Sequence, residues 1–452
     1  MSEIKDKVVS LEILKVAYDE LKEETGQLSE EIGDFNINLM ASSVMWNQTP
    51  LDIANDYRTR KAVLLSTNGN LAHNACACLC ANVIANVWAE NTDGGTSDNA
   101  NSDGQVHSKL RFTYDRLGVM HKINANSIDV DSVTYDLFPV GTEIVGVDGN
   151  SYTVLSDSDN MILYVNSMLH IFSMVYGSDG NTHIVHTSGT VTRKATTVTW
   201  TPTNIFTEVS LSVNDVLGTY DFTRINSEWM KVPQINTQPS VRTNDTYFAL
   251  SINGKGIAII SFDNTDVTIW KYQKFIESSD INLEVSLVNV SWVSNTYPVW
   301  VTAHRTKKGY AKIIGYNNDF EILQKYTMPA SNTRVRLFGA NSIGASSVIF
   351  LACGDSGRNT GSIYMYDLST TPNLSKSVCI WHSNSNITDY ISGFLSKTSV
   401  NSYMYLIGTN KSAIKKNGVS ANCMFWNVDL YSDYSDNLFS LLGVTDGDEV
   451  SY

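Results

Sequence analysis

Short apolar segments recur along the chain, each followed by a polar turn and a second segment that ends in an aromatic residue. The four clearest of them begin 51, 50 and 55 residues apart. Two looser copies lie upstream, over residues 83–88 and 169–174. Such segments, with alternating or continuous apolar character and polar turns between them, are typical of β-strands. The four regular segments cover residues 247–252, 298–303, 348–353 and 403–408.

This period of about 50 residues, with up to four strands in each unit, is typical of a β-propeller, whose blades bury their faces against neighbouring blades. The sequence therefore predicts a mainly β fold with six blades. Five or seven blades remain compatible with the spacing. Scarce proline, at 8 residues, and 42% hydrophobic residues fit a folded chain whose strands are joined by polar turns.

The first 35 residues follow a seven-residue apolar pattern sustained over about four heptads. This pattern predicts an α-helix that associates with other helices, because an isolated helix of this length is marginal in water. A homo-oligomer, with three chains favoured, is one interpretation. The other is an amphipathic helix packed on the propeller of its own chain. The residues expected along the seam include Leu11, Leu14, Tyr18, Leu21, Leu28 and Ile32.

The chain thus divides into an N-terminal oligomerisation helix (1–35), a linker (36–68) and a propeller (69–452). One segment of the linker is expected to add a strand to the last blade and so close the ring. Two long connections, near 116–165 and 200–245, are interpreted as insertions beside the first two blades.

The formal net charge of −14 disfavours nucleic acid as a partner, because phosphate binding relies on clustered Lys and Arg. No apolar run reaches the length of about 18 residues that a membrane helix needs, so we expect no membrane insertion. The first residues lack a basic region followed by an apolar core, so we expect no signal peptide. A neutral or polar ligand fits this composition best.

Three of the six cysteines, Cys76, Cys78 and Cys80, alternate along one predicted strand and so point to one face. We interpret them as small core residues with free thiols. A zinc or iron-sulfur site is the alternative, but no nearby Cys or His pair supplies further ligands. No metal and no cofactor are therefore expected.

If each apolar segment is the second strand of its blade, the turns that leave these strands all emerge on one face. Several of these turns are rich in Asn, Asp, Ser and Gly, which suit the hydroxyl groups of a sugar, while nearby aromatic rings suit its apolar face. Most aromatic residues in such strands pack in the core, and the same composition suits a solvated turn. The candidate ligand-binding residues are Trp88, Glu90, Tyr176, Asn253, His304, Arg305, Asp355 and Asn410.

No phosphate-binding, dinucleotide-binding or serine-hydrolase motif is present in the sequence. A glycoside hydrolase would need two carboxyl groups across the mouth of the ring. Glu90 and Asp355 are the candidates for that pair, although two such acids among six polar turns are also expected by chance. Binding without catalysis is therefore the first expectation, and glycoside hydrolysis is the alternative.

A short acidic helix of the kind at residues 9–24, followed by an all-β body, resembles tail-fibre, baseplate and receptor-binding proteins of bacteriophages. The resemblance implies a virion protein that is made in the host cytoplasm and assembled as a homo-oligomer through its N-terminus. It also implies binding to a host cell-surface polysaccharide or to another tail component. No catalytic residue carries over from this family, because its members share no motif to match.

Overall fold

The computed structural model describes residues 63–426, apart from 68–69, 81, 93–99, 116–127, 195–196, 212–239, 243, 253, 291–296, 332, 340–347, 355–360, 369–372, 384–386, 398–401 and 411–417. The predicted helix of residues 1–35 and most of the linker lie outside these residues. Within them the secondary structure is β-strand, so the prediction of a mainly β fold is confirmed.

Six separate sheets account for the described strands, and we number them as blades in chain order. Blade 1 is formed by β2 (Leu71–Cys80), β3 (Val83–Asn91), β4 (Val106–Asp115) and β5 (Ile128–Asp136). Blade 2 is formed by β6 (Glu143–Val145), β7 (Ser151–Val165), β8 (Met168–Gly177), β9 (Thr182–Lys194), β10 (Thr197–Pro202) and β11 (Thr207–Glu208). Blade 3 is formed by β12 (Ser210–Leu211), β13 (Ser240–Arg242), β14 (Asp245–Ile252), β15 (Gly256–Asp263) and β16 (Asp266–Glu277).

The remaining three blades are four-stranded. Blade 4 is formed by β17 (Ile281–Asn289), β18 (Trp300–Thr306), β19 (Tyr310–Tyr316) and β20 (Ile322–Ser331). Blade 5 is formed by β21 (Thr333–Gly339), β22 (Val348–Gly354), β23 (Gly361–Asp367) and β24 (Val378–Ser383). Blade 6 is formed by β25 (Asp389–Lys397), β26 (Ser402–Asn410), β27 (Gly418–Trp426) and β1 (Val63–Leu64).

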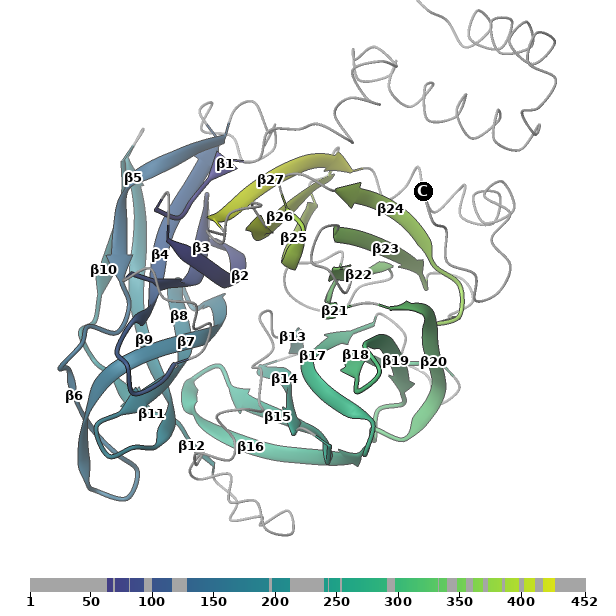
Figure 1. The fold of residues 1–452 in the computed structure, drawn as a ribbon, viewed down its shortest axis with the longest axis horizontal. Coiled ribbons are helices and arrows are strands. Elements are labelled where there is room, and N and C mark those ends of the chain that lie inside the picture. Colours follow the sequence, from purple (N-terminus) through teal and green to yellow (C-terminus); the bar gives the residue numbers. More distant parts are fainter. Residues whose placement is uncertain are drawn as a thin grey trace, which may run out of the picture.

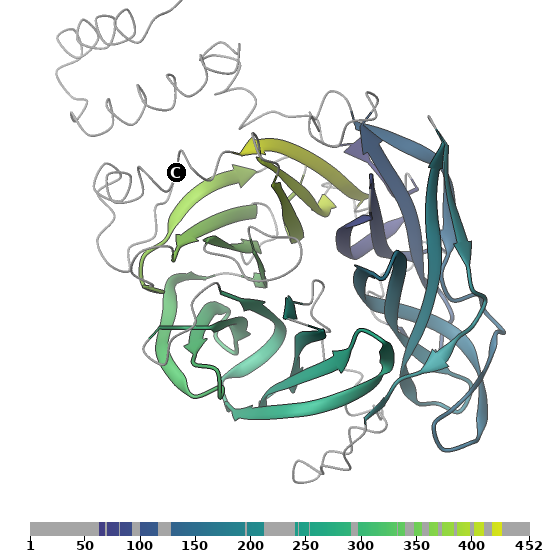
Figure 2. The ribbon, with the colours of Figure 1, turned by 180° about the vertical axis from the view of Figure 1, so that it is seen from behind.

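The blades lie around a common centre, as Figures 1 and 2 show from opposite sides, which is the arrangement of a β-propeller. Each pair of neighbouring blades shares one apolar cluster, and the sixth cluster joins blade 6 to blade 1. The ring therefore closes through side-chain packing. Six blades agree with the number expected from the repeat.

The second strand of each blade explains why the repeat was visible in the sequence. Strands β3, β18 and β22 are buried along their whole length, because both of their faces pack against neighbouring strands or blades. Such strands therefore appear in the sequence as continuous apolar segments. The outer strand β10, in contrast, alternates exposed and buried positions.

The ends of the described chain meet in blade 6. Strand β1 pairs antiparallel with β27, and the backbone N–H of Leu65 donates to the carbonyl of Val419 at 2.9 Å. The outermost strand of the last blade thus comes from the N-terminal side (Figure 1). At the same junction, the Tyr405 hydroxyl donates to Asn86 Oδ1 of blade 1 at 2.6 Å. The last blade is therefore completed by backbone pairing with a strand from the N-terminal side, and a side-chain hydrogen bond joins it to the first blade.

Two features of the predicted domain organisation need correction. Residues 128–136 form the outermost strand of blade 1, and residues 151–165 form a long strand of blade 2, so neither is an insertion. The reason is that β7 carries a run of polar residues, 156–160. Apolar periodicity therefore does not identify this segment as a strand. Of the second long connection, residues 207–211 add strands β11 and β12 to blades 2 and 3.

The three cysteines of β2 lie on one face, as predicted: Cys76 and Cys80 belong to the cluster between blades 1 and 2, and Cys78 packs against it. They are free thiols, and burial raises the pKa of Cys76 well above its usual range. Among the described residues, no three His, Cys, Asp or Glu side chains are arranged to hold a metal ion. No helix in that part of the chain is long and apolar enough to cross a membrane.

Candidate functional site

One strand in each of five blades has an irregularity in its pairing with the next strand along the chain: β2, β7, β17, β21 and β25. In each of them the register shifts as in a β-bulge, and β7 has a further shift between Val154 and Ser156. Bulges redirect a side chain and are frequent next to active sites. Because these strands lie nearest the centre of the ring, each bulge redirects residues close to the axis (Figure 1). The shifts lie between His73 and Cys76, Ser158 and Asn160, Ile281 and Val285, Thr333 and Arg336, and Asp389 and Ser392.

Four of these bulges hold a non-glycine residue with a left-handed backbone. The φ angles are 52° at Asn74, 53° at Asp159, 29° at Glu284 and 49° at Tyr390. Asn and Asp tolerate this conformation, but Glu and Tyr rarely adopt it. Each such residue costs about 1–3 kcal/mol and persists only where its surroundings fix it. The repetition of this strain at one level of the ring indicates a functional site.

The redirected side chains meet across blades. Asn74 Nδ2 of blade 1 donates to Asp159 Oδ1 of blade 2 at 2.5 Å. Arg336 Nη1 of blade 5 donates to the Ala75 carbonyl of blade 1 at 2.8 Å, although blade 6 stands between these blades in the ring. The Arg336 guanidinium also lies 5.8 Å from the centre of the Tyr390 ring, which belongs to blade 6. Arg336 therefore contacts both of the next two blades around the ring.

A second arginine joins from blade 4. Arg305 Nε lies 2.8 Å from Glu284 Oε2, and both side chains are buried. We refer to the six residues Asn74, Asp159, Glu284, Arg305, Arg336 and Tyr390 as the axial cluster.

The electrostatics of the axial cluster are those of a desolvated ionic site. Burial lowers the pKa of Arg336, while the nearby Cys76, Asp159, Tyr390 and Glu284 act in the opposite direction. Burying charges costs free energy that their mutual attraction only partly returns. A cluster of this kind is thus better explained by chemistry at the site than by stability.

The residues predicted from the polar turns are placed differently. Trp88 is buried, and its Nε1 donates to Glu90 Oε2 at 2.8 Å, while Asn70 Nδ2 donates to Glu90 Oε1 at 2.6 Å. Both carboxylate oxygens of Glu90 thus accept hydrogen bonds from side chains of blade 1 or of the residue just before it. Tyr176 is half-buried near the end of β8.

Blade 4 contributes the predicted pair His304 and Arg305. Both are buried, and Arg305 is the predicted residue that enters the axial cluster. Burial lowers the pKa of His304 to about 4, helped by Lys312, so its ring is neutral at pH 7. Asn410 is the last residue of β26, where it pairs with Gly418. Asn253 and Asp355 lie outside the described residues, so the pair Glu90 and Asp355 stays a prediction.

Sequence reasoning did not find Asn74, Asp159, Glu284, Arg336 or Tyr390. Each follows a short stretch of strand, and the five are spread over more than 300 positions of the chain. One local signal was present: the run Ser-Asp-Ser-Asp-Asn at 156–160 is unusually polar for a strand that is otherwise apolar.

Comparison with known proteins gives matches to solved structures alone. No family model matches the sequence, and no curated protein matches it. A sialidase from Trypanosoma rangeli, in complex with difluorosialic acid, is 8% identical with a TM-score of 0.45 and covers 80% of this chain and 59% of its own. An exo-β-1,3-galactanase from Phanerochaete chrysosporium is 14% identical with a TM-score of 0.37, covering 63% of each chain. A GH43_1 enzyme from Xanthomonas citri, complexed with xylose, is 7% identical with a TM-score of 0.37 and covers 82% and 92%.

The chain spans about three fifths of the first two of these structures. Identities of 14% or below and TM-scores below 0.5 are too low to transfer any residue's role. The axial cluster is therefore interpreted from its own geometry.

Proposed function

We propose that the protein is a glycoside hydrolase that cleaves a polysaccharide at the axial cluster. The observation that carries the proposal is that two buried carboxylates, Asp159 and Glu284, are brought toward the axis by strained bulges of different blades. Glycoside hydrolysis uses two carboxyl groups on either side of the scissile bond, one as acid and the other as base or nucleophile.

The contacts of Glu284 indicate which of the two carboxyl groups takes which role. Arg305 Nε, at 2.8 Å, favours the ionised form of Glu284, so we assign Glu284 as the base or nucleophile. With Glu284 in that role, the other buried carboxyl group, Asp159, which accepts a hydrogen bond from Asn74 Nδ2, is assigned as the proton donor to the leaving oxygen. The Tyr390 ring, beside Arg336, offers an apolar face for a sugar ring.

The test is release of new reducing ends from a panel of bacterial capsule, cell-wall and plant polysaccharides. General acid–base groups contribute about 10²–10⁴-fold to rate, so Asp159→Asn and Glu284→Gln are each expected to lose at least a hundredfold in kcat. Asp136→Asn, which changes an exposed carboxylate on β5, is the matched control and should keep wild-type activity. Retention of activity by both axial variants would exclude this assignment.

The earlier candidates are tested in the same assay. Glu90→Gln is expected to leave kcat within a few-fold of wild type, because Glu90 is held inside blade 1. Loss of activity in Glu90→Gln or Asp355→Asn, with Asp159→Asn still active, would instead favour the site at the polar turns. A polysaccharide that the wild-type protein binds but leaves intact would favour an adhesin.

We further propose that this activity belongs to a bacteriophage virion protein that attaches to a host-surface polysaccharide and associates with other tail proteins. The support is the heptad pattern of residues 1–35, which lie outside the described residues. Light scattering is expected to give the mass of three chains for the full protein and of one chain after deletion of residues 1–35. A single-chain mass for both would contradict the oligomer.

A further inference from the structure

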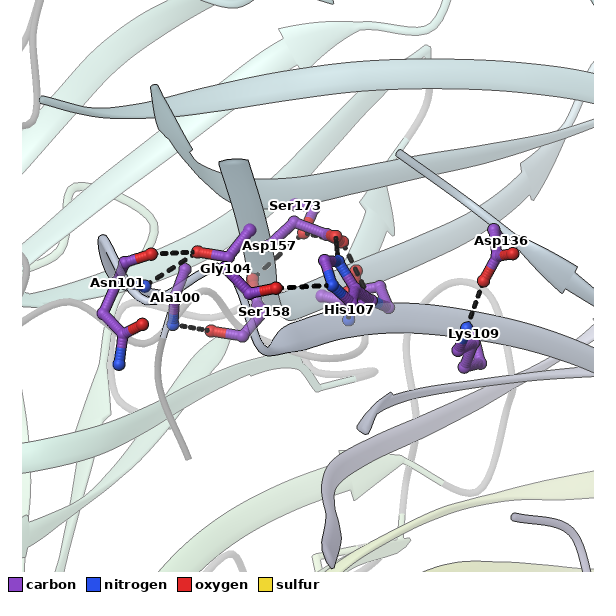
Figure 3. A network of polar contacts seen from close by, with 12 residues as sticks. Ala100, Asn101, Gly104, His107, Lys109, Asp136, Asp157, Ser158 and Ser173 are labelled. Carbon is purple, nitrogen blue, oxygen red and sulfur yellow. Dashed lines mark hydrogen bonds and ion pairs between the residues drawn. The ribbon is translucent and has the colours of Figure 1, made fainter. Parts of the chain in front are cut away.

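Strand β7 binds a segment of blade 1 through consecutive polar side chains (Figure 3). The backbone N–H of Ala100 donates to Ser158 Oγ at 3.0 Å. The backbone N–H of Asn101 donates to Ser156 Oγ at 2.8 Å, and Ser156 Oγ donates to the Asn101 carbonyl at 2.6 Å. These bonds hold the end of the connection between β3 and β4 against strand β7 of blade 2.

Asp157 stands in the middle of this contact and is completely buried. Its Oδ2 accepts from the backbone N–H of Ser108 at 3.1 Å and lies 3.3 Å from Ser173 Oγ, whose hydroxyl can donate either to it or to the Ser158 carbonyl at 3.0 Å. Nδ1 of His107 lies 3.9 Å from Oδ1, and the same imidazole contacts the Gly104 carbonyl through Nε2 at 3.0 Å. The carboxyl group is therefore tied to strands β4 and β8 at once, as Figure 3 shows.

Little positive charge faces this carboxyl group. Strand β4 contributes His107 and Lys109, and Lys109 is itself bound to Asp136 of β5. Strand β8 contributes the uncharged Ser173. Burial raises the pKa of Asp157 to about 7, while the hydrogen bonds of Ser108 and Ser173 and the charge of Lys109 act in the opposite direction. Asp157 is thus largely neutral at pH 6 and largely negative at pH 8.5.

Two residues further along β7, the bulge places Asp159 in the axial cluster. Between them, Ser158 binds Ala100, and beyond the bulge Asn160 Nδ2 donates to Ser108 Oγ at 2.9 Å. The backbone that sets the position of Asp159 is therefore fixed on both sides by residues 100–108. A shift of that segment would move Asp159.

We infer that Asp157 is a positioning residue: it clamps residues 100–108 onto β7, so fixing Asp159, and the clamp loosens when Asp157 becomes negatively charged. The clamp itself is independent of the proposed hydrolase activity, and its effect on catalysis rests on that proposed function. The sign follows from linkage, because a carboxyl group that is harder to ionise in the closed state favours opening as the pH rises.

Hydrogen exchange of the full chain tests the clamp without any substrate. Protection of the amides of residues 100–108, corrected for the intrinsic rate, is expected to fall roughly tenfold between pH 6 and pH 8.5 in the wild type. Asp157→Asn should remove most of this fall, because the side chain no longer ionises. Asp266→Asn, which changes an exposed aspartate of blade 3 outside this network, is the control and should behave as the wild type.

Ser173→Ala provides a second variant in case Asp157→Asn does not fold. It removes a donor that favours the ionised form, so the loss of protection between pH 6 and pH 8.5 should become larger than in the wild type. Constant protection in the wild type, or the same fall in Asp157→Asn as in the wild type, would overturn the inference.

The catalytic consequence is read from the pH profile of kcat/KM on a polysaccharide that the protein cleaves. Asp157→Asn should extend the alkaline limb to higher pH and leave the acid limb in place. An alkaline limb that is unchanged in an active Asp157→Asn variant would overturn the positioning role. Absence of hydrolysis by the wild type on every glycan would overturn the proposed function, while the exchange measurement would still decide the clamp.

Discussion

Replacing Arg336 with methionine is expected to lower the free energy of unfolding by about 3–5 kcal/mol, the usual effect of removing one charge from a group of buried charges that interact. Methionine keeps the length and apolar stem of the side chain but removes the charge. The variant removes a cation that interacts electrostatically with the buried Asp159 and Glu284, and it leaves the Ala75 carbonyl without this donor. Urea unfolding of the propeller gives the measurement.

An arginine at the surface of blade 2 serves as the control. Arg193 lies over the Tyr114 ring at 4.6 Å, and Arg193→Met is expected to cost about 0.5–1 kcal/mol, as for exposed cation–π contacts. An unfolding free energy of Arg336→Met within about 1 kcal/mol of the wild type would contradict the ionic axial cluster.

A double-mutant cycle separates the charge from the packing. If Arg336 and Glu284 interact through their charges, Arg336→Met combined with Glu284→Gln should cost less than the sum of the two single variants, by about 0.5–3 kcal/mol. If the free-energy costs of the two single variants simply add in the double variant, the two residues are not electrostatically coupled. That result would contradict their assignment to a common site.

The repeat and the closure of the ring could be predicted from the sequence because both depend on strands that are buried on two faces. The second strands, such as β18 and β22, are apolar because they pack between blades. Because the same packing occurs in successive blades, apolar segments recur along the sequence at a regular spacing. The expectation that the linker supplies a closing strand used the same logic, since an unpaired edge of the last blade needs a partner.

The axial cluster could not be predicted, because no local rule determines it. The position of Glu284 depends on a register shift against β18, and that shift depends on how the whole of blade 4 packs. Arg336 and Ala75 are 261 positions apart, and nothing in either neighbourhood indicates that they touch. Polar turns were the visible candidates, whereas the axial cluster is formed by a few buried charged residues from several blades.

Strain and buried charge occur together in the axial cluster, and both oppose folding. Glu284 has a left-handed backbone and an ion pair in the same residue, so it is unfavourable locally and electrostatically. Residues that break local rules in this way are expected at functional sites, where the remaining structure compensates for them. The six apolar clusters between blades supply that compensation.

Removal of the closing strand is the second change with a large expected effect. A chain that begins at residue 60 should be as stable as one that begins at residue 36, because β1 is retained. A chain that begins at residue 68 loses β1 together with Leu65 and Ser66. Leu65 is buried between blades 6 and 1, and burial of a leucine side chain contributes about 1.5–3 kcal/mol.

Losing the hydrogen bonds between residues 65–66 and the two neighbouring blades lowers the free energy of unfolding further. The N–H of Val419 donates to Ser66 Oγ at 2.9 Å, and Arg111 Nη1 donates to the Leu65 carbonyl at 2.8 Å. Each hydrogen bond removed costs about 0.5–1.5 kcal/mol, and more where it leaves a buried charge without a partner. Together these losses are on the order of 5 kcal/mol.

The truncated chain also exposes the edge of β27, which can pair with another molecule. We therefore expect the chain from residue 68 to unfold at a lower urea concentration than the chain from residue 60, and to aggregate as its concentration rises. A synthetic peptide covering residues 60–67, added in excess, should partly restore the urea midpoint by pairing with the open edge. Equal midpoints for the two truncated chains would show that β1 does not close the ring, and that the contacts between blades 6 and 1 suffice without it.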